Sequence, residues 1–240
     1  MIAWGLVPAR GGSKSIPYKN LVPVAGIPLL DYGALAAQSS GVLDRIVCST
    51  DDDMIAGRAR HLGIEVDRRP DHLATDDAAV ADVARDFLSR QPVGNRPDVI
   101  VLIQPTSPFL LPQHVRMLVK ALESDLTANS AQTVTTVPHN HHAWNQRVVD
   151  GDYVSFHFEA ERAIAYNKQK KPKLYIFGNL VAARSRALLA GESFFAKPSV
   201  FKEIPWPYDL DLDSPQDLKL AEAMLSAGLV DLPHIIKTEP

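Results

Sequence analysis

The sequence has little of several features that would place it in a special class of protein. It contains a single cysteine, Cys48, which excludes an internal disulfide and is typical of a reducing compartment. No apolar run is long enough to cross a bilayer, so we expect no membrane partner. The formal net charge is only −3, which argues against a broad nucleic-acid-binding surface but is compatible with a local basic pocket.

The start of the chain also lacks the pattern of a secretory signal. The apolar run Ile2–Val7 is too short for the hydrophobic region of a signal peptide, and no basic segment precedes it. We therefore expect a cytoplasmic protein. Cys48 lies in the apolar run Arg45–Ser49, and we interpret it as a buried strand residue rather than as a nucleophile.

The chain has no internal repeat and no linker rich in glycine and serine, so we expect a single domain over residues 1–240. In the first half, β-rich apolar runs alternate with helical patterns. Strands are expected at Ile2–Val7, Arg45–Ser49, Ile64–Val66 and Asp98–Ile103, and helices at Pro28–Gln38, Met54–Leu62, Asp76–Ser89 and Leu111–Leu122. This alternation predicts an α/β fold with a mostly parallel sheet.

In the second half, strand-like runs are separated by turns. Strands are expected at Gln132–Val137, Gln146–Val149, Tyr153–Phe158 and Leu174–Ala183, and a helix at Leu218–Leu225. Asp150 and Gly151 form a strong hairpin signal. We therefore expect the domain to carry a small excursion over about Pro138–Pro172.

Three histidines crowd the entrance to this excursion. They are His139, His141 and His142. A polar lid is favoured over a Zn²⁺ site, because no nearby cysteine or carboxylate completes a zinc ligand set.

A flexible and basic loop, Pro8–Asn20, follows the first expected strand. Ligands of open parallel sheets gather at the carboxyl ends of the strands, where this loop begins. Gly11 and Gly12 allow backbone N–H groups to approach a ligand closely. The cations of the loop, which can hold phosphate oxygens, are Arg10, Lys14 and Lys19. The loop is therefore suited to a di- or triphosphate.

Two better-known phosphate loops are excluded by spacing. A P-loop requires Gly-x-x-x-x-Gly-Lys-Ser/Thr, but here Ser13 precedes Lys14. A dinucleotide fingerprint requires Gly-x-Gly-x-x-Gly, but this loop has two adjacent glycines and no third. The alternative to a phosphate site is a solvated basic turn.

Two further stretches place polar groups at the ends of expected strands. Asp98–Pro108 carries a buried strand into Gln104, Thr106 and Ser107, and its prolines stiffen the backbone there. Arg69 lies at the end of another strand, shortly before a helix start. These side chains would meet the basic loop at one edge of the sheet.

The stretch Tyr208–Asp213 has a carboxylate at every second position. In an extended strand, Asp209, Asp211 and Asp213 would point to one face. Carboxylates so close repel one another unless a cation lies between them, and oxygen ligands favour Mg²⁺ or Mn²⁺. The alternative is a charged edge strand that resists sheet pairing.

Four stretches of the chain follow one another in an order found in a known family, and they are Ala9–Asn20, Arg69–Asp76, Gln104–Pro108 and Asp211–Asp213. They resemble the acylneuraminate cytidylyltransferases, which are the CMP-sialic acid synthetases and their relatives acting on bacterial nine-carbon acidic sugars. The resemblance implies a three-layer α/β nucleotidyltransferase fold and a homodimer that exchanges the excursion. It also implies that CTP and a sugar acid give CMP-sugar and pyrophosphate, with the anomeric hydroxyl attacking the α-phosphorus.

The resemblance also assigns roles to the matching positions. The expected catalytic cations, which would stabilise the leaving pyrophosphate, are Arg10, Lys14 and Lys19. The expected nucleotide-binding residues are Ala9, Arg10, Gly11, Gly12, Ser13, Lys14, Asn20, Arg69 and Ala78. The expected sugar-binding residues are Gln104 and Ser107, and the expected Mg²⁺ or Mn²⁺ ligands are Asp211 and Asp213.

The choice of sugar acid stays open at this stage. Sialic acid synthetases usually have Arg-Pro-Asn-Gly where this chain has Ile176–Asn179. The first alternative is a CTP-dependent transferase for another ulosonic acid, such as Kdo, legionaminate or pseudaminate. The second is a nucleotide-sugar-binding relative without catalysis, against which the three cations and the paired aspartates argue.

Overall fold

The computed structural model describes residues 1–165 and 167–235, and only the backbone of Lys168. Tyr166, which is part of the predicted excursion, lies outside the described residues. So do residues 236–240, the end of the predicted single domain.

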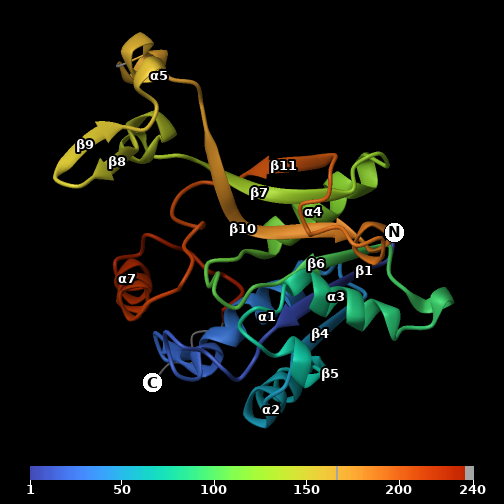
Figure 1. Cartoon of the computed structure of the whole chain (residues 1–240). Coiled ribbons are helices and arrows are strands. Elements are labelled where there is room, and N and C mark those ends of the chain that lie inside the picture. The colour runs from blue at the N-terminus through green and yellow to red at the C-terminus, as the bar shows by residue number, and fades with distance from the viewer. Residues whose placement is uncertain (166, 236–240) are drawn as a thin grey trace.

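A seven-stranded sheet forms the centre of the molecule, in the order β11-β7-β10-β6-β1-β4-β5 (Figure 1). Its strands are β1 (Ala3–Pro8), β4 (Arg45–Thr50), β5 (Glu65–Arg68), β6 (Val99–Leu102), β7 (Ser130–Thr136), β10 (Tyr175–Arg184) and β11 (Ser199–Glu203). β1 is parallel to β4 and β6, β4 to β5, and β7 to β11, whereas β10 is antiparallel to both of its neighbours. The predicted α/β fold with a mostly parallel sheet is confirmed.

Helices cover both faces of this sheet. They are α1 (Leu29–Ser40), α2 (Asp53–His61) and α4 (Pro112–Ser124) on one face, and α3 (Val80–Ser89) and α6 (Ser185–Leu189) on the other. Side chains of a strand alternate between faces, so Val7 of β1 packs with the first group and Leu6 with the second. The molecule therefore has the three layers that the family resemblance implied.

Cys48 lies within the core on β4, as predicted. The residue is fully buried, and desolvation raises the pKa of its thiol to about 12. A thiol that stays protonated at neutral pH is a poor nucleophile. Cys48 is thus a packing residue.

The last helix, α7 (Pro215–Ser226), packs with α1 and the segment before α4 in a third apolar cluster. It begins three residues before the predicted start because Ser214 and Asp217 form a capping box. The Asp217 carboxylate accepts the Ser214 backbone N–H at 2.7 Å, and Ser214 Oγ accepts the Asp217 N–H at 3.4 Å. This cap fixes the point at which the aspartate segment enters the helix.

The predicted hairpin is confirmed in β8 (Arg147–Asp150) and β9 (Tyr153–Phe156), which are followed by α5 (Glu159–Ile164). Figure 1 shows these elements standing beyond the ends of β7 and β10, away from the central sheet. His142 is buried nearby, with Nε2 at 3.0 Å from the Pro172 carbonyl oxygen. The described residues contain no group of three metal-ligating side chains, and no described helix is long and apolar enough to cross a membrane.

Two sequence predictions were wrong. The helix expected from Asp76 begins at Val80, because residues 74–77 form bends and a turn in which the Ala78 N–H bonds to the Thr75 carbonyl oxygen at 3.4 Å. No strand forms over Tyr208–Asp213, because the Tyr208 and Leu210 N–H groups bond within turns to the Pro205 and Pro207 carbonyl oxygens, both at 3.2 Å. The sequence patterns also did not indicate α5, α6, β11 or the short hairpin of β2 (Pro23–Val24) and β3 (Ile27–Pro28).

Candidate active site

A cleft of about 470 Å³ opens at the carboxyl ends of β1, β5 and β6. It is lined by Pro8, Arg10, Gly12, Ser13, Lys14, Ser15, Lys19, Asn20, Arg69, Thr75, Asp76, Ala78, Val80, Val83, Gln104, Pro105, Thr106 and Asp213. An adjoining hollow of about 500 Å³ shares Arg10, Lys14 and Asp76 with it. All four stretches singled out in the sequence therefore contribute to this cleft, the last of them through Asp213.

Two cations of the basic loop converge on one carboxylate to which the sequence assigned no role. Arg10 Nη2 lies 2.5 Å from Asp76 Oδ1, and Lys14 Nζ lies 2.5 Å from Asp76 Oδ2. The hydrogen bonds from Lys14 and from Arg10 lower the pKa of Asp76. Asp76 is therefore an anion held between the two side chains that were predicted to bind phosphate.

The two glycines of the loop have different environments. A side chain at Gly11 would place its Cβ 2.8 Å from Asp52 Cβ, and the Gly11 N–H donates to Asp51 Oδ1 at 2.9 Å. Gly11 therefore allows the loop to pass close to the start of α2, and it does not line the cleft. Gly12 does line the cleft, with open space where a Cβ would be.

The end of the loop is fixed by buried polar groups. Asn20 Nδ2 donates to the Arg10 carbonyl oxygen at 2.9 Å, which closes the loop on itself. The Lys19 side chain is only 10% exposed, and its Nζ lies 3.1 Å from Asp213 Oδ1. Lys19 thus links the phosphate loop to the aspartate segment, which is 194 positions away in the sequence.

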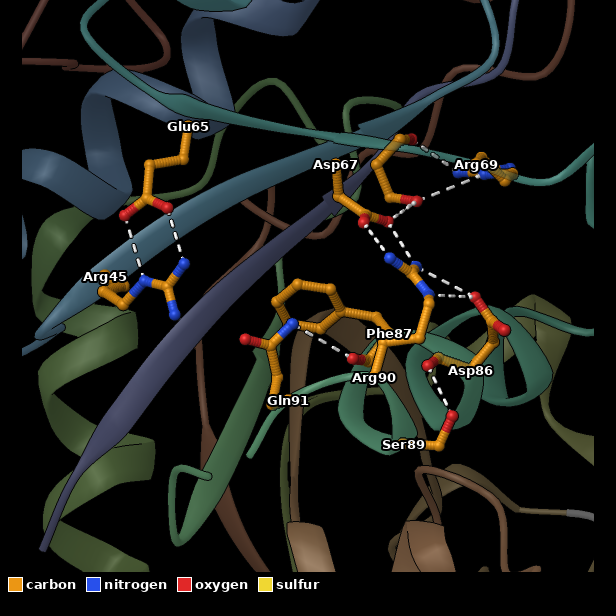
Figure 2. A network of polar contacts seen from close by, with 10 residues as sticks. Arg45, Glu65, Asp67, Arg69, Asp86, Phe87, Ser89, Arg90 and Gln91 are labelled. Carbon is orange, nitrogen blue, oxygen red and sulfur yellow. Dashed lines mark hydrogen bonds and ion pairs between the residues drawn. The ribbon is translucent and has the colours of Figure 1, made fainter. Parts of the chain in front are cut away.

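Arg69 forms a buried part of the cleft wall. Its Nη2 donates to the Ser49 carbonyl oxygen at 2.7 Å, and Ser49 Oγ donates to Asp67 at 3.2 Å. Arg90 holds the same Asp67 with two hydrogen bonds of 2.7 and 3.0 Å (Figure 2). Burial lowers the pKa of Arg69. The network fixes the guanidinium rigidly at the position from which we predicted contact with the nucleoside.

The remaining predicted residues divide into two groups. Gln104 and Ala78 line the cleft. Ala9 and Ser107 are buried and do not line it, and the Ala9 N–H is bonded to the Ser49 carbonyl oxygen at 3.0 Å. The structure therefore brings Gln104 to the site and leaves Ser107 behind the cleft wall.

The aspartate segment reaches the site without forming a strand. Its apolar Leu212 is buried in the third cluster between two exposed residues, Asp211 and Asp213. Asp213 lines the cleft, whereas Asp211 does not line it, is bonded through its carboxyl to Thr106 and is partly desolvated. The Leu212 N–H donates to the Thr106 carbonyl oxygen at 2.8 Å, and the Asp217 carboxylate accepts the Asp213 N–H at 3.0 Å. These two backbone bonds hold the segment that carries both carboxylates. The second bond could have been anticipated from the sequence, because Ser214–Asp217 carries the pattern of a helix capping box.

A buried polar network holds the same segment from behind. Asn179 Nδ2 donates to the Tyr208 carbonyl oxygen at 2.8 Å and lies 3.0 Å from His114 Nδ1. Asn179 Oδ1 accepts from Thr133 Oγ1 at 3.2 Å. Desolvation lowers the pKa of His114 to about 4, so the ring is neutral at neutral pH. β10, β7 and α4 therefore support the aspartate segment through uncharged groups.

Comparison with known proteins identifies the family of the chain. Residues 4–224, which include every part of the cleft, match the family described as cytidylyltransferase. The chain belongs to the cytidylyltransferase family. The resemblance drawn from the four sequence stretches is confirmed.

Within this cytidylyltransferase family, relatives of known name differ in length. N-acylneuraminate cytidylyltransferase B of Danio rerio is 30% identical over 218 residues, which are 90% of this chain and 50% of the relative. CMP-N,N'-diacetyllegionaminic acid synthase of Legionella pneumophila is 30% identical over 226 residues, which are 92% of this chain and 94% of the relative. The chain thus spans about half the length of the fish relative and nearly all of the bacterial one.

Solved structures agree with the cytidylyltransferase assignment at the level of the fold. The CMP:2-keto-3-deoxy-manno-octonic acid synthetase complexed with CTP superposes with a TM-score of 0.73 and 17% identity, over 95% of this chain and 100% of that one. The 4-diphosphocytidyl-2C-methyl-D-erythritol synthase of Anaerococcus prevotii superposes with a TM-score of 0.61 and 14% identity, over 94% of this chain and 98% of that one. The predicted nucleotidyltransferase fold is confirmed.

The charges of this cytidylyltransferase site suit a divalent cation and a polyphosphate. Desolvation raises the pKa of Asp211, and repulsion from Asp213 adds to the rise, while a hydrogen bond from Thr106 opposes it. Two carboxylates on one short segment fit Mg²⁺, which is commonly held by one or two carboxylates together with substrate phosphates. The cations of the loop and the Asp213 carboxylate line one cleft, and this mixture of charges suits a complex of a divalent cation with a polyphosphate.

Proposed function

We propose that the chain transfers CMP from CTP to a sialic-acid-like nonulosonic acid and releases pyrophosphate. The observation that carries the proposal is the convergence of Arg10, Lys14 and Lys19 with the Asp213 carboxylate around one cleft in a cytidylyltransferase-family fold. Phosphoryl transfer depends mainly on positioning and on neutralising charge, which this set of groups can supply.

In the proposed reaction the anomeric oxygen of the sugar attacks the α-phosphorus. The bond from that phosphorus to the bridging oxygen breaks, pyrophosphate leaves, and the hydroxyl proton passes to water. Arg10 and Lys14 hold the outer phosphates, and the buried Lys19 stabilises negative charge as it develops on the leaving group. Arg69 and the backbone at Ala78 hold the nucleoside, and Gln104 orients the sugar.

Asp211 and Asp213 would hold Mg²⁺ or Mn²⁺ in this proposal. Both supply only oxygen ligands, and desolvation together with repulsion from Asp213 raises the pKa of Asp211, which a bound cation would oppose. When bound, the cation would neutralise phosphate charge and lower the pKa of the attacking hydroxyl.

A legionaminate-type acid is the second candidate for the sugar. The N,N'-diacetyllegionaminic acid synthase matches this chain along 94% of its own length, whereas the N-acylneuraminate relative from Danio rerio matches along 50%. The chain also has Ile176–Asn179 where sialic acid synthetases usually have Arg-Pro-Asn-Gly, so the arginine is missing. A sugar acid other than N-acetylneuraminate is consistent with both observations.

Pyrophosphate release tests the proposed function directly. Each of CTP, UTP, ATP and GTP is combined with Mg²⁺ and with a panel of nine- and eight-carbon sugar acids that includes N-acetylneuraminate, legionaminate, pseudaminate and Kdo. We expect release with CTP and one nine-carbon acid, and none without the sugar. Release with another nucleotide would overturn the cytidine assignment, and CTP binding without any turnover would favour the non-catalytic relative.

We also propose that the chain forms a homodimer through its excursion. Every residue of β8 is exposed, and so are large apolar side chains of β9 and α5, with Tyr153 82% and Ile164 77% exposed. A two-stranded hairpin without a covered face is marginally stable in water, so a second copy of the chain is the natural cover. Sedimentation at micromolar concentration should give twice the 26.3 kDa chain mass, with Val149→Lys shifting the protein to monomer. A monomeric wild type would exclude the dimer.

A further inference from the structure

Asp76 lies in the cleft between two cations that were predicted to bind phosphate. Each of its two oxygens meets one cation, Arg10 at Oδ1 and Lys14 at Oδ2, both at 2.5 Å. It lines both the cleft and the adjoining hollow. A carboxylate bridging two cations reproduces the charge and the spacing of acceptors that a phosphate group would offer.

We propose that Asp76 competes with the phosphates of the nucleotide for Arg10 and Lys14, and so sets the affinity of the site for phosphate anions. The inference rests on the proposed function, in which these two cations hold the triphosphate. It adds a specificity-determining residue, because displacing Asp76 breaks two ion pairs and only an anion that engages both cations replaces them. One phosphate group can bridge both cations as the carboxylate does, and a polyphosphate offers further oxygens to the other donors of the cleft.

The chain around Asp76 is built so that the carboxylate can leave. Residues 74–79 form bends, turns and irregular backbone between the single 3-10 turn before them and the start of α3 at Val80. The Asp76 side chain is 37% exposed and that of Lys14 is 85% exposed, so neither ion pair is sealed from water. Exposed ion pairs contribute little to folding, which makes their exchange for a phosphate easy.

A second carboxylate that contacts the basic loop provides a contrast. Asp51 accepts the Gly11 N–H at 2.9 Å, but it does not line the cleft. It braces the loop from outside, whereas Asp76 stands inside the site. Hence the competition is assigned to Asp76 alone.

Calorimetric titration of the whole chain with inorganic pyrophosphate and with CTP tests the inference. We compare wild type with Asp76→Asn and with the matched control Asp77→Asn, which removes a neighbouring carboxylate that borders the hollow but lies outside both ion pairs. Asp76→Asn should bind pyrophosphate about five- to tenfold more tightly, a range consistent with two exposed ion pairs. Asp77→Asn should change it by less than about twofold, as expected of a screened surface charge.

Equal or weaker pyrophosphate binding by Asp76→Asn than by Asp77→Asn would overturn the inference, and so would an absence of binding. Asp76→Ser is a second variant with the same expected gain, and the thermal midpoint of each variant confirms that it is folded. The result is separable from the proposed function. Pyrophosphate binding without CTP binding in the wild type would count against that function, while the comparison of variants would still decide the role of Asp76.

Discussion

Asp211→Asn is expected to lower turnover of CTP with its sugar acid by about a thousandfold, or about 4 kcal/mol of transition-state stabilisation. The substitution keeps the size of the side chain and its ability to accept the hydrogen bond from Thr106. It removes one of the two negative charges proposed to hold the divalent cation. Steady-state pyrophosphate release over a range of Mg²⁺ concentrations measures the loss.

The same variant should not lose folding stability. The folded-state pKa of Asp211 is raised, so its protonated form is favoured in the fold and the stability it contributes is lost as the pH rises through that pKa. At neutral pH the uncharged asparagine should therefore give a thermal midpoint at or above that of the metal-free wild type. A lower midpoint would contradict this interpretation of the raised pKa.

Asp209→Asn is the matched control for Asp211→Asn. Asp209 belongs to the same segment and its pKa is also raised by desolvation, but it is not one of the two proposed metal ligands. We expect turnover within about threefold of wild type, because the residue has no part in the proposed charge neutralisation. Equal losses in the two variants would exclude Asp211 as a specific metal ligand.

Lys19→Met is expected to have the second-largest effect, a loss of about a hundredfold or more in kcat/KM, as for removal of one buried charge-stabilising group. Only 10% of the Lys19 side chain is exposed, so its ammonium acts on phosphate charge through protein rather than through water. Its partner Asp213 is 82% exposed, so loss of the ion pair leaves a carboxylate that water can solvate. The loss should therefore appear in catalysis rather than in stability, which initial rates and thermal denaturation together would measure.

Comparing Lys14→Met with Lys19→Met separates the effect of burying a lysine from the effect of its charge. Lys14 bears the same charge in the same loop, but 85% of its side chain is exposed and solvent screens it. We expect kcat/KM to fall by about tenfold or less, mainly through a higher KM. Added salt should make the difference from wild type smaller still. Should the two lysine variants lose equal activity, burial of Lys19 would not be the source of its contribution.

Several features of the fold could be predicted because their causes lie close together in the sequence. β1 is a short apolar run, the hairpin of β8 and β9 surrounds Asp150 and Gly151, and α1 follows the helical period. The motif order similarly indicated the family and the end of the sheet at which the site forms. Each of these depends on neighbouring residues or on chain order, which the sequence displays directly.

The role of Asp76 could not be predicted in the same way. Its partners Arg10 and Lys14 lie far earlier in the chain, and helical periodicity extended the predicted helix over it. In the fold Asp76 lies in a turn before the helix, where the loop after β1 brings both cations to it, and such a tertiary arrangement overrides local propensity. The anchoring of Arg69 by Ser49 has the same origin, since it depends on β4 and β5 pairing in parallel.

The sequence alone was enough to assign the α/β class, the cytidylyltransferase family and the mixed charge of the candidate site, where a cationic loop and one aspartate of the pair line the same cleft. The folded chain was needed to show that Asp211 and Asp213 belong to an irregular segment rather than to a strand. That segment is held by the Thr106 carbonyl, the Asp217 carboxylate and the Asn179 amide. The reason is physical: a strand needs a partner with free hydrogen-bonding groups, and the folded chain offers these residues side-chain and loop partners instead.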